Sequence, residues 1–118
     1  MIKAIALLKK RPSLTQEDFI AYYETRHSAL ILRLLPGIVD YRRNFVQREA
    51  AYVFAEAGPI DFDVVTELWF ENRAAYDAAM AKAAEPEIAR LIAEDEEQIF
   101  ERGATRMFLV EERGGRSA

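Results

Sequence analysis

The chain of 118 residues contains no cysteine and a single histidine, His27. The absence of cysteine excludes disulfide bonds, thiolate catalysis, and zinc or haem ligation by cysteine. One histidine is too few for a self-contained zinc site, so we expect neither a metal nor a cofactor. Any chemistry that needs an imidazole must therefore take place at His27.

The sequence also lacks a long hydrophobic run and an excess of positive charge. Every apolar stretch is shorter than the roughly 20 residues that span a bilayer, and the one at residues 1–12 is too short for a secretion signal. The net charge is −4, whereas binding to nucleic acid needs clustered Lys and Arg. We therefore expect a cytoplasmic protein that binds neither membranes nor nucleic acids.

What the sequence does contain is the composition of one globular domain. Hydrophobic residues make up 51% of the chain and charged residues 31%, which is typical of a folded chain rather than a disordered one. The length fits one domain. We expect residues 1–112 to form this domain and the sequence RGGRSA, residues 113–118, to be a flexible tail.

Four segments have the composition of β-strands. In the clearest of them, FDVVTELWF at residues 62–70, Thr66 and Leu68 point to one face while Glu67 and Trp69 point to the other. Both faces are largely apolar, so we expect both to be covered. The other predicted strands are residues 2–9, 38–49 and 104–112.

Three helices are predicted, over residues 15–35, 72–84 and 85–103. A Thr or Asn cap begins the first two, and a proline in the first turn begins the third. Apolar residues recur at helical spacing in the first and third helices. The acidic run EDEE, residues 94–97, is interpreted as the solvent-facing side of the third helix.

The order β-α-β-β-α(α)-β predicts an α+β, ferredoxin-like fold: a four-stranded antiparallel sheet with the helices on one face. The second face of that sheet, which carries Val65 and Trp69, would be left in water. A two-fold dimer that stacks two sheets would cover it. We therefore expect the chain to form a homodimer.

Three blocks of the chain share a recognisable pattern: LLKKRPSLTQEDFIAYYETRHSAL at residues 7–30, FDVVTELWFEN at 62–72, and TRMFLVEE at 105–112. Together they resemble the EthD family, within the dimeric α/β-barrel superfamily, over nearly the whole chain. The resemblance implies that fold more firmly than it implies an activity. Superfamily members include cofactor-free monooxygenases, polyketide cyclases, dehydratases, a lactone isomerase and haem-binding enzymes, so the fold does not settle the function.

Phe19, Tyr23 and His27 recur every four residues on one face of the first predicted helix. Because Phe19 belongs to the apolar stripe, we expect His27 to point toward the sheet, where it could take or give a proton. The alternative is a structural histidine bonded to a backbone carbonyl, with Tyr23 as a core ring. The resemblance favours catalytic roles for His27 and Tyr23, with Phe19 against the substrate.

Further candidates lie on the predicted strands. Tyr41 and Arg43 share one face of the second strand, where Arg43 could bind an enolate or carboxylate oxygen, or could be a solvated charge on an edge strand. We assign Tyr41, Arg43 and Thr66 to substrate binding. Glu67 lies on the strand at residues 62–70, on the face that carries Trp69, where a carboxylate needs a cation. We expect Arg42 to supply that cation, within the subunit or across the dimer axis.

Two functions from different classes fit these residues. The first is a small cofactor-independent enzyme that acts on an aromatic or polyketide-like carbonyl compound, by proton transfer (dehydration, cyclisation or isomerisation) or by cofactor-free oxygenation. The second is a non-catalytic protein that binds small apolar ligands in the same pocket. A haem-binding oxidoreductase with His27 as axial ligand is a third alternative.

Overall fold

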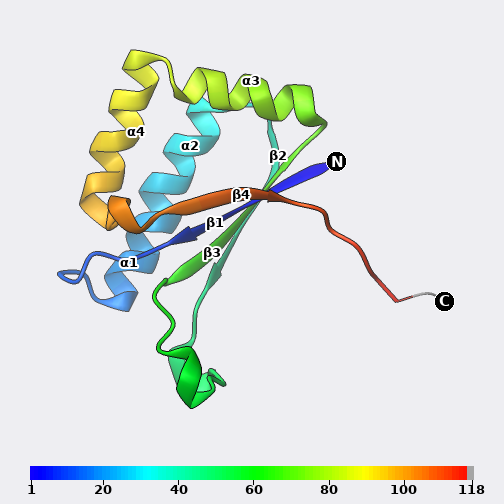
Figure 1. Ribbon diagram of the computed structural model, residues 1–118. Helices are drawn as coiled ribbons and strands as arrows, with labels where there is room; N and C mark the ends of the chain where they lie inside the picture. The colour runs from blue at the N-terminus through cyan, green and yellow to red at the C-terminus, as the bar shows by residue number, and fades with distance from the viewer. Residues whose placement is uncertain (117–118) are drawn as a thin grey trace.

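The computed structural model describes residues 1–116, and its elements follow the predicted order (Figure 1). Ser117 and Ala118, the end of the predicted tail, lie outside the described residues. The main elements, in chain order, are β1 (Ile2–Leu8), α1 (Gln16–Tyr22), a π-helical turn (Tyr23–His27), α2 (Ser28–Leu34), β2 (Ile38–Phe45), β3 (Val64–Phe70), α3 (Arg73–Ala83), α4 (Pro86–Ile99) and β4 (Arg106–Val110).

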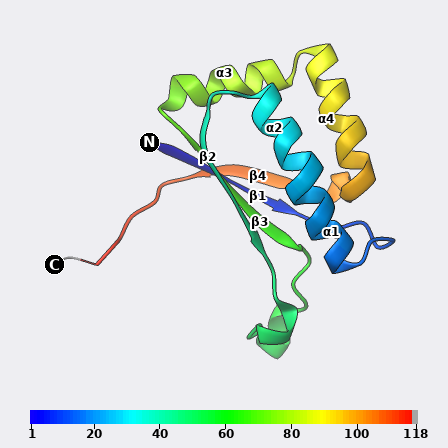
Figure 2. The ribbon, with the colours of Figure 1, turned by 180° about the vertical axis from the view of Figure 1, so that it is seen from behind.

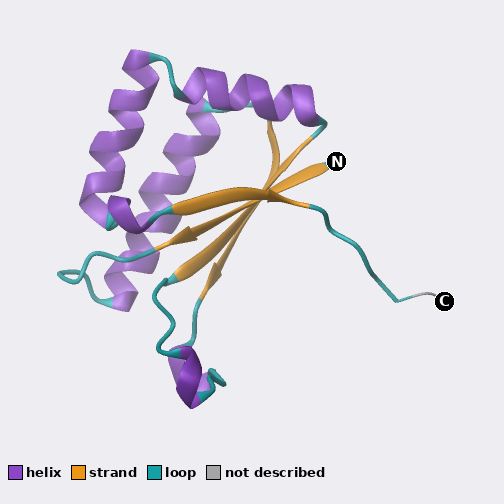
Figure 3. Ribbon diagram, in the orientation of Figure 1, coloured by secondary structure: helices purple, strands orange, loops and turns teal. Residues whose placement is uncertain are grey.

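The strands form one antiparallel sheet in the order β2-β3-β1-β4. The helices lie on one side of this sheet, as Figures 2 and 3 show from opposite directions. This is the predicted α+β, ferredoxin-like fold. No helix in residues 1–116 is long and apolar enough to cross a membrane.

Strand β3 shows how the sequence gives the sheet two different faces. Thr66, Leu68 and Phe70 are buried beneath the helices, whereas Glu67 and Trp69 on the opposite face are only half-buried. This alternation is the predicted one, because successive side chains of a strand point to opposite sides. Within the described part of the chain, no helix covers the second face (Figure 1).

Strand β2 departs from simple alternation. Its register against β3 shifts between Ile38 and Asp40, so that Ile38 and Tyr41 both face the helices while Val39 is 49% exposed. Val39 is the extra residue of this β-bulge, so simple alternation does not hold between Val39 and Tyr41. The strand also ends at Phe45 rather than at residue 49.

The helix starts agree with the predicted caps. The Thr15 hydroxyl accepts a hydrogen bond from the Asp18 backbone N–H at 3.0 Å, and the Asn72 side chain accepts one from Ala75 N–H at 2.9 Å. Each bond satisfies a donor that the first turn of a helix leaves free. Pro86 occupies the first turn of α4, where its missing N–H costs nothing.

An aromatic core joins the long helix formed by α1, the π turn and α2 to the end of β2 and the end of α4. The Phe19 ring packs edge-to-face against Tyr23, Phe45 and Phe100, with centroids 5.9–6.2 Å apart. Phe100 lies just beyond α4, which ends at Ile99 and not at residue 103 as predicted. The chain leaves the helix there because Phe100 is extended and pairs with Lys10 in an isolated β-bridge.

The loop between β2 and β3 projects beyond the sheet (Figure 1). Its base is fixed by Asp63, a buried carboxylate that accepts a hydrogen bond from Lys10 N–H and another from the Arg48 guanidinium, each at 2.7 Å. At the other end of the chain, residues 111–116 have no regular secondary structure. These two segments lie outside the layered part of the domain.

Candidate functional site

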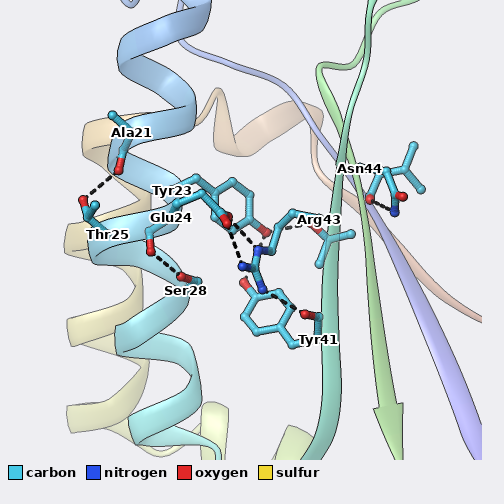
Figure 4. A network of polar contacts seen from close by, with 10 residues as sticks. Ala21, Tyr23, Glu24, Thr25, Ser28, Tyr41, Arg43 and Asn44 are labelled. Carbon is cyan, nitrogen blue, oxygen red and sulfur yellow. Dashed lines mark hydrogen bonds and ion pairs between the residues drawn. The ribbon is translucent and has the colours of Figure 1, made fainter.

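The long helix is interrupted at Tyr23–His27, where the backbone forms one π turn closed by a hydrogen bond from Ser28 N–H to the Tyr23 carbonyl. The Ser28 hydroxyl donates to the Glu24 carbonyl at 3.0 Å and supports the same turn (Figure 4). A regular α-helix is predicted here, so the turn is a departure from the expectation. Such turns are frequent at functional sites, and this one contains both candidate catalytic residues.

His27 pairs with an acidic residue from the other half of the chain. Its Nδ1 lies 2.8 Å from Oδ2 of Asp95 on α4, and the histidine is only 3% exposed. An ionised carboxylate can only accept a hydrogen bond, so the proton of the neutral imidazole must sit on Nδ1. The Nε2 lone pair is then free to accept a proton from a ligand.

The second oxygen of Asp95 is also occupied. Its Oδ1 accepts a hydrogen bond from the Tyr22 hydroxyl at 2.7 Å. Burial, together with the neighbouring Asp95 carboxylate, raises the pKa of Tyr22 to about 12. Tyr22 therefore stays protonated at neutral pH and remains a donor, and the Asp95 carboxylate is held from both sides.

The position of Asp95 corrects the interpretation of residues 94–97 as a solvent-facing run. The two end residues of this run are exposed, but Asp95 and Glu96 are half-buried. The sequence did contain a signal for Asp95. It follows Ile92 by three residues and precedes Ile99 by four, so it belongs to the apolar stripe of its helix.

Tyr23 and His27 line a cavity of about 180 Å³ between the helices and the sheet. Tyr41 and Thr66 line it from strands β2 and β3, so the structure brings together these four predicted site residues. The remaining lining is apolar, apart from two polar side chains near the helix and strand ends, Glu96 and Thr105. An apolar pocket with a few convergent polar groups is the usual form of a small-molecule site.

Three hydroxyl groups form a chain along the sheet side of this cavity. Tyr41 OH donates to Tyr23 OH at 3.2 Å, and Tyr23 OH lies 2.6 Å from Oγ1 of Thr66 (Figure 4 shows the two tyrosines). Burial raises the pKa of both phenols. Both are therefore neutral hydrogen-bonding groups and not phenolate bases.

Arg43 does not reach the cavity. Its guanidinium donates to both carboxylate oxygens of Glu24, at 2.7 and 2.8 Å, and to the Tyr41 carbonyl at 2.9 Å (Figure 4). Its side chain is 19% exposed. Arg43 therefore ties the π turn to strand β2, and the predicted contact with a substrate oxygen in the cavity is not seen.

Phe19 is also corrected as a substrate-binding residue. Its ring is fully buried among Tyr23, Phe45 and Phe100 and is not part of the cavity wall. The four-residue spacing correctly put Phe19 and Tyr23 on one helix face. Because the two residues lie one turn apart along that face, only Tyr23 reaches the cavity.

The predicted ion pair between Glu67 and Arg42 does not form within the described chain, although the two residues are cross-strand partners in the register of β2 and β3. Arg42 instead bonds Asp40 at 3.0 Å, and its guanidinium lies over the Trp69 ring. The cation near Glu67 is Lys3 of β1, at 3.9 Å. A contact between Glu67 and Arg42 across a dimer axis stays a prediction.

A larger hollow of about 490 Å³ lies around the N-terminal residues, between Lys3, Trp69 and residues 110–112. Its one basic side chain, Lys3, is already paired with Glu112 at 2.6 Å. No histidine or hydroxyl side chain lines it. The smaller cavity beside His27 therefore holds the groups that could carry out chemistry.

The residues around His27 do not fit a haem. A cavity of about 180 Å³ is close in size to one that encloses a single benzene ring, far below the volume of a four-pyrrole macrocycle. Among the described residues, no group of three or more His, Cys, Asp or Glu side chains is placed to hold a metal ion.

Comparison with known proteins identifies the family. The EthD domain profile matches residues 11–103. The chain belongs to the EthD family. No curated protein sequence matches it significantly.

Several solved structures share the fold. An EthD family protein from Bacillus halodurans is 18% identical with a TM-score of 0.61, covering 96% of this chain and 100% of that one. SnoaB from Streptomyces nogalater, a cofactor-independent oxygenase, is 15% identical with a TM-score of 0.56, covering 97% and 94%. A dimeric protein with a ferredoxin-like fold from Bacteroides fragilis is 13% identical with a TM-score of 0.58, covering 93% and 94%. At these identities the likeness shows the fold alone.

The bond between Arg43 and Glu24 predicts a pH-dependent contribution to stability. The hydrogen bonds from Arg43 hold the pKa of Glu24 below its usual value, so the contribution is present above that usual value and is lost as acidification protonates the carboxylate. Because Glu24 is partly exposed, we expect Glu24→Gln to lower the free energy of unfolding by only about 0.5–1 kcal/mol at neutral pH. The difference should shrink below about pH 4.

Denaturant unfolding at several pH values measures this difference. Glu56→Gln, at an exposed position in the loop between β2 and β3, is the matched control and should change little. A destabilisation by Glu24→Gln that persists unchanged in acid would show that the ion pair with Arg43 is not its cause.

Proposed function

We propose that this EthD-family protein is a cofactor-independent enzyme that removes a proton from the carbon next to a carbonyl group, in a small aromatic or polyketide-like compound. The observation that carries the proposal is the contact between His27 Nδ1 and Asp95 Oδ2 at the wall of an apolar cavity. Asp95 orients the imidazole and stabilises the imidazolium that forms, and Nε2 acts as the general base.

The proposed step balances without a cofactor. The C–H bond breaks, its proton goes to Nε2 of His27, and its electron pair moves into the carbonyl group, which becomes an enolate. The hydroxyl chain of Tyr41, Tyr23 and Thr66 uses two of its three protons internally, and the third supplies one hydrogen bond to the enolate oxygen as its charge develops. Return of the proton to another carbon gives isomerisation, and loss of water or attack on a second carbonyl gives dehydration or cyclisation.

Cofactor-free oxygenation is a second candidate. It is supported by the fold shared with SnoaB, which is described as a cofactor-independent oxygenase. The first step is the same, because a substrate carbanion must form before it can react with dioxygen. A protein that only binds small apolar ligands would use the same cavity and would carry out no proton transfer.

Deuterium exchange tests the base directly. Acetophenone has an exchangeable methyl group next to its carbonyl and a single ring, so we expect the protein to accelerate exchange of that methyl in heavy water, followed by NMR. His27→Gln should reduce the acceleration about 10²–10⁴-fold, and Asp95→Asn should also reduce it because the tautomer is no longer fixed.

Glu94→Gln is the control for Asp95→Asn, because Glu94 is exposed on the same helix and pairs with Arg90. It should leave the rate unchanged. Equal exchange by His27→Gln and the unaltered protein would contradict the assignment of the base. A bound ketone that never exchanges would favour the non-catalytic ligand-binding function.

We further propose that the protein is a homodimer in which two sheets stack face to face. Support comes from the face of β3 that carries Val65 and Trp69, which no helix covers in the described chain, and from the dimeric ferredoxin-like protein that shares the fold. Sheets pack about 10 Å apart through such apolar faces.

Light scattering measures this assembly. A dimer of two 13.5 kDa chains has a mass of 27 kDa, and Trp69→Glu should shift the protein toward the monomer because it puts a charge into the proposed interface. Tyr52→Glu, on the exposed loop between β2 and β3, is the control and should stay dimeric. A 13.5 kDa species for the unaltered chain would contradict the stacked sheets.

A further inference from the structure

The cavity beside His27 is small and partly open to solvent. Its volume is about 180 Å³, and a cavity of about 150 Å³ in another protein is known to enclose benzene. Pockets for drug-sized ligands start at about 300 Å³. A single six-membered ring with one short substituent fills this volume, whereas a fused second ring would have to extend out of the cavity.

The cavity also lacks a cation for an anionic ligand. Among the residues that line it there is no Lys and no Arg. Two arginines contact lining residues without lining the cavity themselves, and both pair with carboxylates: Arg43 with Glu24 at 2.7 Å, and Arg102 with Glu96 at 3.2 Å. Glu96 lines the cavity, and its side chain is 22% exposed, so the one acidic residue of the lining contributes a negative charge.

The charges around His27 also disfavour an anionic ligand. A carboxylate ligand would need an imidazolium as its partner, but Asp95 at Nδ1 already balances the positive charge of such a ring, and Glu96 adds a second negative charge on the same helix. The neighbouring hydroxyls of Tyr22, Tyr23 and Tyr41 stay neutral because their pKa values are raised. An unpaired carboxylate in such a site is costly, whereas a neutral carbonyl needs only the hydroxyl donors.

We propose that the cavity selects a neutral, single-ring carbonyl compound and rejects a carboxylate of the same shape, with Glu96 as a residue that determines this specificity. The inference rests on the proposed function, since it defines the substrate class of the same site. It adds two properties of the ligand that the family fold does not specify, namely its maximum size and its lack of negative charge.

The single histidine of the chain makes binding directly observable. The imidazole C–H signals of His27 are followed by NMR near neutral pH during titration with acetophenone, with benzoate, which is nearly isosteric but anionic, and with 2-acetonaphthone, which has a second ring. We expect saturable shifts with acetophenone. Benzoate should bind about tenfold or more weakly because of its charge, and 2-acetonaphthone about tenfold or more weakly because of overpacking.

Glu96→Gln tests the residue itself. It removes the negative charge and releases Arg102, so the affinity for benzoate should rise by on the order of tenfold, while the affinity for acetophenone stays within about twofold. Glu97→Gln is the matched control, because Glu97 is the next residue, is exposed and does not line the cavity. It should change neither affinity.

Several results would overturn the selection. They are benzoate binding as tightly as acetophenone, equally tight binding of the two-ring ketone, no saturable shift with acetophenone, or no effect of Glu96→Gln on benzoate. A different result would contradict the proposed function. Acetophenone that binds as expected but undergoes no deuterium exchange would support the selection and remove only the role of His27 as a base.

Discussion

The hydrogen bond between Asp95 and His27 is the contact on which the site depends. It joins α4 to the π turn of the long helix, and it fixes which imidazole nitrogen carries the proton. A half-buried carboxylate needs donors on both oxygens to offset its desolvation, and Tyr22 supplies the second one at 2.7 Å. The same three side chains therefore hold two helices together and prepare a base beside an apolar cavity.

The sheet provides the other half of the site. Alternation along β3 turns Thr66 toward the helices, and the bulge in β2 turns Tyr41 the same way. The two hydroxyls meet Tyr23 from the helix side. Because the buried phenols stay protonated, this wall can only donate or accept hydrogen bonds, and the proton-accepting role is left to His27.

Much of the fold could be predicted because the local signals agreed with the tertiary structure. The caps at Thr15 and Asn72 and the alternation of residues 62–70 each depend on neighbours in the sequence, and each was confirmed. The spacing of Tyr23 and His27 likewise put both on the buried face of one helix. Patterns of this kind need no knowledge of what lies across the core.

The predictions failed where the partner of a side chain is far away in the sequence. Asp95 is 68 residues from His27, and its acidic neighbours hid its place in the apolar stripe. Arg43 was predicted on the correct strand, but the direction of its side chain alone could not show that its guanidinium would bind Glu24. Glu67 was paired with the nearest cation of the hairpin, whereas the fold brings Lys3 from β1 beside it.

The most direct test of this account is the tautomer of His27, measured by ¹⁵N NMR at a pH where the imidazole is neutral. Because the chain has one histidine, its two ring nitrogens can be assigned without ambiguity. The account predicts a proton on Nδ1 and a bare Nε2, with this preference lost in Asp95→Asn. A neutral ring protonated on Nε2 in the unaltered protein would show that Asp95 does not accept from Nδ1, and that no free lone pair faces the cavity to act as the base.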